Sequence, residues 1–230
     1  MVPALAMAQN ISVDFGNDST LTERAVQLIG LITLLSLAPS ILVMVTSFTR
    51  IVVVLSLLRT AIGLQTAPPN AVMISLALFL TAFVMAPTLQ KSYDDGLAPL
   101  MAGQIQYQEA FNLSVAPIHE FMRLNVREKD VQLFQDMSGK PTPDKPEDLS
   151  LTVLVPAFMI SELRRAFEIG FLLFVPFIII DMVVSSVLMA MGMLMLPPVV
   201  ISLPFKLIFF VLVDGWYLVA GSLVRSFATG

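Results

Sequence analysis

Four long stretches of the chain carry almost no charge, and they constrain its fold more than any other feature of the sequence. They are residues 25–48 with an apolar extension over 51–58, residues 71–89, residues 169–196 and residues 199–224. A membrane-spanning helix needs about 20 predominantly apolar residues, so each stretch is a candidate span. The composition agrees, because 57% of the residues are hydrophobic and only 13% are charged, against about 25% charged in soluble domains. No polar face alternates with the apolar one, which disfavours a water-soluble bundle. We predict an all-α membrane protein.

The charged residues gather between the second and third stretches, and this divides the chain into four parts. We expect a polar N-terminal tail over residues 1–24, a first apolar helical hairpin over 25–89, a helical polar insert over 90–161 and a second apolar helical hairpin over 162–230. Within the insert, segment 138–149 is rich in proline and charge and is typical of a flexible linker. Arg59 favours a cytoplasmic position for the first short loop, which makes the insert extracytoplasmic.

The N-terminal tail contains Ala4-Leu5-Ala6 and Ala6-Met7-Ala8, which both have the small-x-small form of a signal-peptidase site. The charged and apolar regions that should precede such a site are missing. Two interpretations stay open: an irregular tail, or the remnant of a secretory signal peptide.

Two pairs of consecutive prolines, Pro68-Pro69 and Pro197-Pro198, each separate two of the apolar stretches. Proline lacks the backbone N–H and disfavours helix at the preceding residue, so each pair should act as a hinge at the tip of a helical hairpin. Single prolines also interrupt the stretches, at Pro39, Pro87, Pro176 and Pro204. Because a broken helix leaves carbonyl groups unsatisfied in lipid, we expect these kinked helices to pack mainly on protein.

The ionisable residues of the second hairpin that are candidates for buried positions are Glu162, Asp181, Lys206 and Asp214. Such residues are costly in a membrane segment and are usually paired or functional. In an antiparallel hairpin that closes near residues 194–196, Lys206 lies about 5 Å along the axis from Asp181, so the two can meet within one subunit. We predict structural ion pairs for these residues, with Glu162 reaching a lysine only across a subunit boundary. The alternative is a proton or ion relay through Asp181, Lys206 and Asp214, which would make the chain an ion-coupled secondary transporter or channel.

Methionines recur at every second position before the second proline pair, at Met189, Met191, Met193 and Met195. This period is not helical, and Gly192 lies among them, so the pattern indicates an irregular loop with Gly192 as a hinge. Irregular backbone at membrane depth is tolerated only where it is buried in protein or lines a cavity. Because methionine side chains are unbranched and adapt to varied shapes, several copies of this loop around one axis would form a soft apolar constriction.

The sequence gives no support for an enzyme, a cofactor site or a metal site. It has no cysteine and a single histidine, His119. None of the nucleophile-elbow, phosphate-loop or zinc-protease motifs is present. The net charge of −4, without a basic patch, argues against nucleic-acid binding.

Five segments together resemble one known family. They are SFTRIVVVLSLLRTAIG (47–63), APPN (67–70), ALFLTAFVMAP (77–87), FVPFIIIDMVVSSVLMAMGMLMLPP (174–198) and SLPFKLIFFVLVDGW (202–216). They resemble the FliP family of flagellar biosynthetic proteins, which extends to counterparts in injectisome type III secretion. The resemblance extends over residues 25–225.

The resemblance implies a core subunit of the type III protein export gate, in the flagellar basal body and the bacterial inner membrane. In that family several copies assemble with FliQ and FliR into a helical ring through which unfolded export substrates pass, and FlhB and FlhA belong to the same apparatus. A methionine-rich gasket at the narrowest point would fall on Met191, Met193, Leu194 and Met195. The family's buried contact between subunits would fall on Glu162 and Lys206. A scaffold that only nucleates the ring, with the pore closed by a partner, is a second alternative.

Overall fold

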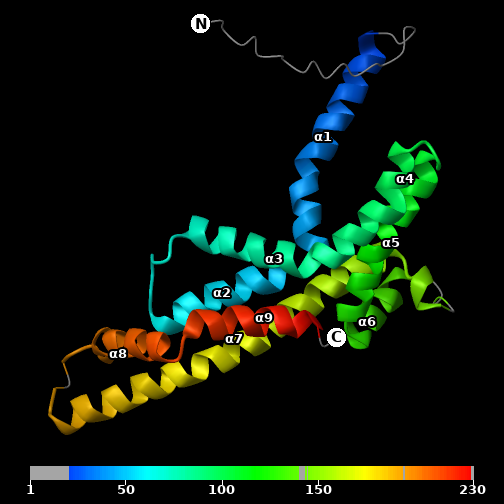
Figure 1. Ribbon diagram of the computed structural model, residues 1–230. Coiled ribbons are helices and arrows are strands. Elements are labelled where there is room, and N and C mark those ends of the chain that lie inside the picture. The colour runs from blue at the N-terminus through cyan, green and yellow to red at the C-terminus, as the bar shows by residue number, and fades with distance from the viewer. Residues whose placement is uncertain (1–20, 140–142, 144, 194, 229–230) are drawn as a thin grey trace, which may run out of the picture. The chain divides into compact units, whose positions relative to one another are not determined.

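The computed structural model describes residues 21–139, 143, 145–193 and 195–228. All regular secondary structure in these residues is helical, which confirms the all-α fold class (Figure 1). In chain order the helices are α1 (Leu21–Val45), α2 (Phe48–Ile62), α3 (Asn70–Ser92), the π-helical turn η1 (Tyr93–Leu97), α4 (Ala98–Met101), α5 (Tyr107–Asn125), α6 (Glu128–Ser138), the 3-10 turn η2 (Pro146–Asp148), α7 (Leu151–Ala190), α8 (Pro198–Leu212) and α9 (Gly215–Ala228). The described residues divide into two compact units, one before and one after the boundary between Ile41 and Leu42.

The first apolar stretch forms two separate helices, α1 and α2, where the sequence predicted one helix with an apolar extension. Two threonine hydroxyls bind carbonyl groups at the end of α1: Thr46 Oγ1 donates to Leu42 O (2.7 Å) and Thr49 Oγ1 donates to Val43 O (3.0 Å). The last carbonyls of a helix have no partner within it, so these bonds stabilise its end. The next helix, α2, starts after this end of α1. It continues to Ile62, beyond the predicted apolar extension 51–58.

α2 and α3 form a hairpin whose turn contains the first proline pair (Figure 1). Gly63 ends α2 with a φ of +92°, a left-handed conformation that glycine adopts without steric cost. Pro69 immediately precedes α3. Arg59 Nη1 fixes the turn by donating to Pro68 O (3.3 Å) and to Asn70 Oδ1 (2.6 Å).

The polar insert is built on a continuation of α3, which passes through η1 and α4 to Met101 and packs against α5. Gly96 allows this close packing, because a Cβ atom there would lie 2.0 Å from Ser114 Oγ and 2.7 Å from Ala110 O. Within the expected linker 138–149, residues 140–142 and 144 lie outside the described residues, and the described part contains the turn η2.

The second hairpin consists of α7 and the two C-terminal helices. α7 has 40 residues and passes through Pro156 and Pro176 without a break, so it is about 60 Å long at 1.5 Å per residue. α8 returns along α7 after the loop 191–197. The fourth apolar stretch was expected to be kinked at Pro204, but it divides instead into α8 and α9, which meet at 63°. Asp214 lies at this division with a φ of +51°, which a right-handed helix cannot contain.

α2 lies at the centre of the main apolar core and contacts α3, α7 and α8. The buried residues of this core are Ile51, Val54, Leu55, Leu58, Ala61, Ile62, Met73, Ala77, Ala166, Phe177, Phe210, Val219 and Leu223. In the described part of the chain, two helical segments are long and apolar enough to cross a membrane, Asn70–Met101 and Leu151–Ala190. Two bent helix pairs, Ala25–Leu37 with Pro39–Val45 and α8 with α9, can each supply one more. Of the four predicted spans, two are thus continuous and two are broken.

Candidate functional site: the methionine loop and the buried ion pairs

The second hairpin ends at the loop between α7 and α8 (Figure 1), and this loop contains Met191, Met193 and Met195. Gly192 has a φ of +75°. Its N–H donates to Met189 O (3.0 Å), and the N–H of Met193 donates to Leu188 O (2.9 Å), which is the usual way in which a glycine closes a helix C-terminus. The backbone of the described residues 191–193 and 195–197 is irregular, as the pattern predicts. Met189 is part of α7, so the first of the four methionines lies on a helix and not in the predicted irregular loop.

The loop methionines are exposed to different degrees, and none is buried in the chain's own core. The exposed fractions are 58% for Met191, 43% for Met193 and 99% for Met195. Leu194, the other residue of the predicted gasket, lies outside the described residues. An exposed apolar cluster of this kind is typical of a surface that contacts another protein or a membrane.

An ion pair between a buried lysine and a half-buried aspartate fixes the hairpin about three helical turns from the loop. Lys206 Nζ on α8 donates to Asp181 Oδ2 on α7 at 2.7 Å, and Ser202 Oγ donates to the other carboxylate oxygen of Asp181. Lys206 also donates to Ala61 O (3.3 Å), one of the last carbonyls of α2, where a positive charge is favourable. Lys206 therefore joins three helices, and the structure brings it together with Asp181 within one chain.

A second buried ion pair joins Arg50 on α2 to Glu162 on α7, and both side chains are almost completely buried. Arg50 Nε donates to Glu162 Oε2 at 2.8 Å, and Nη2 donates to the other oxygen. Arg50 Nη1 donates to Ser226 O (3.1 Å) and Ser226 Oγ (2.9 Å) near the end of α9. The guanidinium also lies 3.7 Å from the centre of the Phe227 ring, a cation–π contact.

Glu162 thus has a partner that the sequence did not reveal. Within the chain its carboxylate binds Arg50, and the contact with Lys206 of another subunit stays a prediction. Two signals pointed to Arg50: it is one of only two charged residues between 25 and 89, and it lies in an apolar stretch. Neither signal identifies a partner 112 positions away.

Asp214 does not join these pairs. The residue is exposed at the turn between α8 and α9, and its carboxylate forms no ion pair or hydrogen bond with the described residues. The ion pair predicted for this position is therefore not formed within the described part of the chain, and a pair with another subunit stays a prediction. A relay through Asp181, Lys206 and Asp214 therefore lacks its third group in the described chain.

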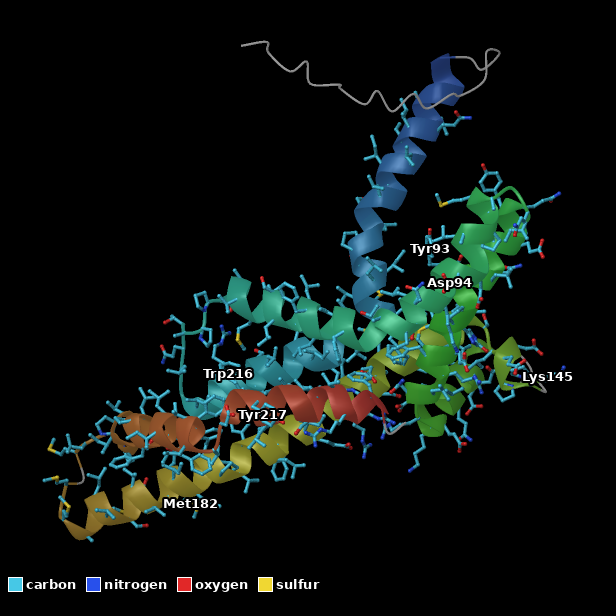
Figure 2. The ribbon with its side chains drawn as sticks, in the orientation of Figure 1. Tyr93, Asp94, Lys145, Met182, Trp216 and Tyr217 are labelled. Atoms are coloured by element: carbon cyan, nitrogen blue, oxygen red, sulfur yellow. The ribbon has the colours of Figure 1, made fainter. Side chains whose placement is uncertain are left out.

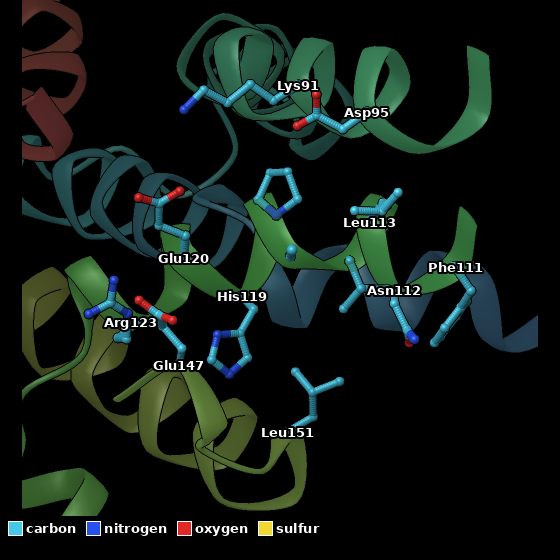
Figure 3. Close-up of a pocket in the computed structure, with 13 residues that line it drawn as sticks. Lys91, Asp95, Phe111, Asn112, Leu113, His119, Glu120, Arg123, Glu147 and Leu151 are labelled. Atoms are coloured by element: carbon cyan, nitrogen blue, oxygen red, sulfur yellow. The ribbon is translucent and has the colours of Figure 1, made fainter. Parts of the chain in front are cut away.

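A cleft of about 630 Å³ with a mixed polar and apolar lining lies in the insert, between the end of α3, η1, α5 and the start of α7 (Figure 3). Its charged lining residues are of both signs: Lys91, Asp95, Glu120, Arg123 and Glu147. His119 Nε2 lies 2.8 Å from Leu149 O, so the single histidine helps to hold the backbone that leads into α7. Among the described residues, no group of three histidine, aspartate or glutamate side chains is placed to hold a metal ion.

Fold and site together define a class: an all-α membrane protein in which an exposed methionine loop ends one hairpin and buried ion pairs hold that hairpin to its neighbours. The chain matches the FliP family over residues 31–223. It is 62% identical to the flagellar biosynthetic protein FliP of Caulobacter vibrioides, over 100% of this chain and 87% of that protein. It is 52% identical to that of Bacillus subtilis (96% and 100%) and 50% identical to that of Rhizobium meliloti (97% and 93%). The chain therefore belongs to the FliP family.

Family membership establishes the general role. The chain is a flagellar biosynthetic protein of the type III secretion class and a structural component of flagellar export, not an enzyme. Its apolar helices fit a membrane-associated component of the flagellum.

Proposed function

We propose that the chain is a core subunit of the type III export gate in the basal body and the inner membrane, and that several copies line a channel for unfolded substrates. Met191, Met193, Leu194 and Met195 would form the gasket that seals this channel. The observation that carries the proposal is the exposure of the three described methionines on a loop at the tip of a hairpin.

An apolar ring closes a channel by contact and by dewetting, because water and ions find no polar partner in it. Methionine suits this role, since its side chain has three rotatable bonds and fills gaps of varied shape. Gly192 and the pair Pro197-Pro198 bound the loop and confine changes of backbone direction to it. A passing chain would then displace side chains by rotamer changes and leave α7 and α8 in place.

The proposed partners are further copies of this chain together with FliQ and FliR in one ring, with FlhB and FlhA in the same apparatus. Large apolar side chains on α3 and α7 support such an assembly: Phe79 is 77% exposed, Phe171 66% and Leu172 68%. Surfaces of this kind need a cover of protein or lipid.

The proposal is tested by replacing Met191, Met193 and Met195 together by alanine in the assembled complex. The expected result is an intact oligomer that leaks small solutes at rest, because truncation removes the side chains that fill the constriction. A matched control replaces Met101 and Met137, which are 78% and 73% exposed but lie in the insert, and should not leak. Unchanged permeability of the triple variant, in complexes of normal size, would refute the gasket.

Crosslinking distinguishes a gasket from a scaffold that only nucleates the ring. The sequence contains no cysteine, so a Met193→Cys variant carries a single reactive thiol. A stalled export substrate should crosslink to this position if the loop lines the channel. Crosslinks confined to a partner subunit would favour the scaffold.

A further inference from the structure

The turn between α8 and α9 has a composition unlike that of any other turn in the described chain. This segment, residues 211–217, is called the elbow below. It joins two apolar helices at 63°, and it contains the only tryptophan of the sequence, Trp216, next to Tyr217 (Figure 2).

The backbone of the elbow places a carboxylate at its apex. Asp214 has a φ of +51°, in a region that non-glycine residues seldom enter and that aspartate and asparagine tolerate best. The next residue, Gly215, is needed for packing, because a Cβ atom there would lie 2.2 Å from the ring of Phe210. That ring also contacts Trp216, with centroids 5.4 Å apart and planes at 87°. The indole is therefore held in place while remaining 42% exposed.

The side chains around Asp214 change from apolar to amphipathic over a short distance. Ile208, Val211 and Leu212, on one face of α8, are 56%, 75% and 79% exposed, and Tyr217 is 67% exposed. The Asp214 carboxylate is exposed beside them and has no side-chain partner among the described residues.

The residues of the elbow require different environments, so the elbow cannot lie entirely in water or entirely in hydrocarbon. An unpaired carboxylate is costly in hydrocarbon, so Asp214 requires water or headgroups. The apolar face of α8 is most stable in hydrocarbon or against protein. Tryptophan and tyrosine are enriched where these two environments meet, because their rings are apolar and each carries a polar atom. The elbow is also continuous with α8 and α9, which together are long and apolar enough for a membrane segment.

We infer that the elbow binds the headgroup layer of a phospholipid bilayer. Asp214 faces the water, Trp216 and Tyr217 lie at headgroup level, and Val211 and Leu212 enter the hydrocarbon. The pair α8 and α9 is then bent at the membrane surface and does not cross the bilayer as one span. This inference does not depend on the methionine gasket.

The single tryptophan provides a direct test on the unmodified chain of residues 1–230, reconstituted into phosphatidylcholine vesicles. Lipids brominated near the headgroup, at mid-chain or near the chain end quench tryptophan according to its depth. We expect the shallowest bromines to quench Trp216 most strongly, and aqueous iodide to quench it partially. Strongest quenching by the deepest bromines would show a continuous span and overturn the inference. An absence of lipid quenching would show that protein covers the elbow, and would overturn it equally.

An Asp214→Asn variant tests the role of the charge, because asparagine tolerates the same backbone conformation. Without the carboxylate the elbow should sink, and the strongest quenching should move to bromines deeper in the chain. A quenching profile identical to that of the wild-type chain would show that the carboxylate does not set the depth of the elbow. A Glu168→Gln change on the exposed side of α7, outside the elbow, should leave the profile of Trp216 unchanged.

Discussion

Replacing Arg50 by methionine should destabilise the fold more than any other single removal of a charge. The change leaves the Glu162 carboxylate, which is 0% exposed, without its cation. It also removes two hydrogen bonds to Ser226 and the contact with the Phe227 ring. Breaking a buried ion pair by removing one partner costs about 3–5 kcal/mol. Since about 1.4 kcal/mol is a factor of ten, the ratio of folded to unfolded chain should fall by about two to three and a half orders of magnitude.

The assay is unfolding of the purified chain in mild detergent by a graded denaturant, followed by the helical circular dichroism signal. The double variant Arg50→Met/Glu162→Leu should recover much of the loss, because it leaves no buried charge unpaired. The difference between the single and double variants separates the penalty of an orphan carboxylate from the net contribution of the pair.

The matched control is Arg164→Ala, which breaks the exposed pair between Arg164 and Glu168, each 59% exposed. An exposed helical pair of this spacing contributes about 0.3–0.5 kcal/mol, so the midpoint should hardly move. If Arg50→Met shifted the unfolding midpoint no more than this control, the buried Glu162 carboxylate would not need Arg50 as its partner for the fold to be stable. If the double variant were as unstable as the single one, the orphan carboxylate would not be the cause.

Two further predictions use the same unfolding assay. Lys206→Met should cost less than Arg50→Met, about 1–2 kcal/mol, because its partner Asp181 is 31% exposed and can be partly hydrated; an equal or larger loss would contradict this ranking. Gly96→Ala should cost about 1–3 kcal/mol, since the added Cβ would meet backbone atoms of α5 at 2.7 and 2.8 Å. Gly170→Ala should cost less, because the nearest atom there is the end of the flexible Leu57 side chain; the reverse order would show that α5 can shift.

Structural features that depend only on residues close in the sequence could be predicted. The pairing of Asp181 with Lys206 is an example. Both residues lie on one hairpin, so helical rise and the position of the proline pair are enough to bring them level. The irregular loop at Gly192 follows from the same kind of local pattern. The family was predicted from the resemblance of long ordered motifs, and the match over residues 31–223 confirms it.

Features that depend on distant contacts or on single backbone angles could not be predicted. The partner of Glu162 lies 112 positions away, on a helix whose orientation no local pattern fixes. The break at Asp214 is hidden by hydropathy, because the residues on both sides are apolar and the change is one positive φ. The hydroxyl contacts of Thr46 and Thr49 that end α1 likewise require coordinates to be recognised.

Methionine occupies two kinds of position in this chain, and its abundance alone indicates neither. Met73, Met85 and Met122 are at most 5% exposed and fill gaps in the cores, where a flexible side chain adapts to irregular neighbours. Met193 and Met195 have the same chemistry but project from irregular backbone, between a left-handed glycine and two prolines. The two groups differ in the backbone that carries them. On a packed helix the methionine side chain is covered by neighbouring residues, whereas on the loop it is left exposed and can contact other molecules. Methionine side chains are therefore candidates for a seal only where the fold leaves them without contacts to the rest of the chain.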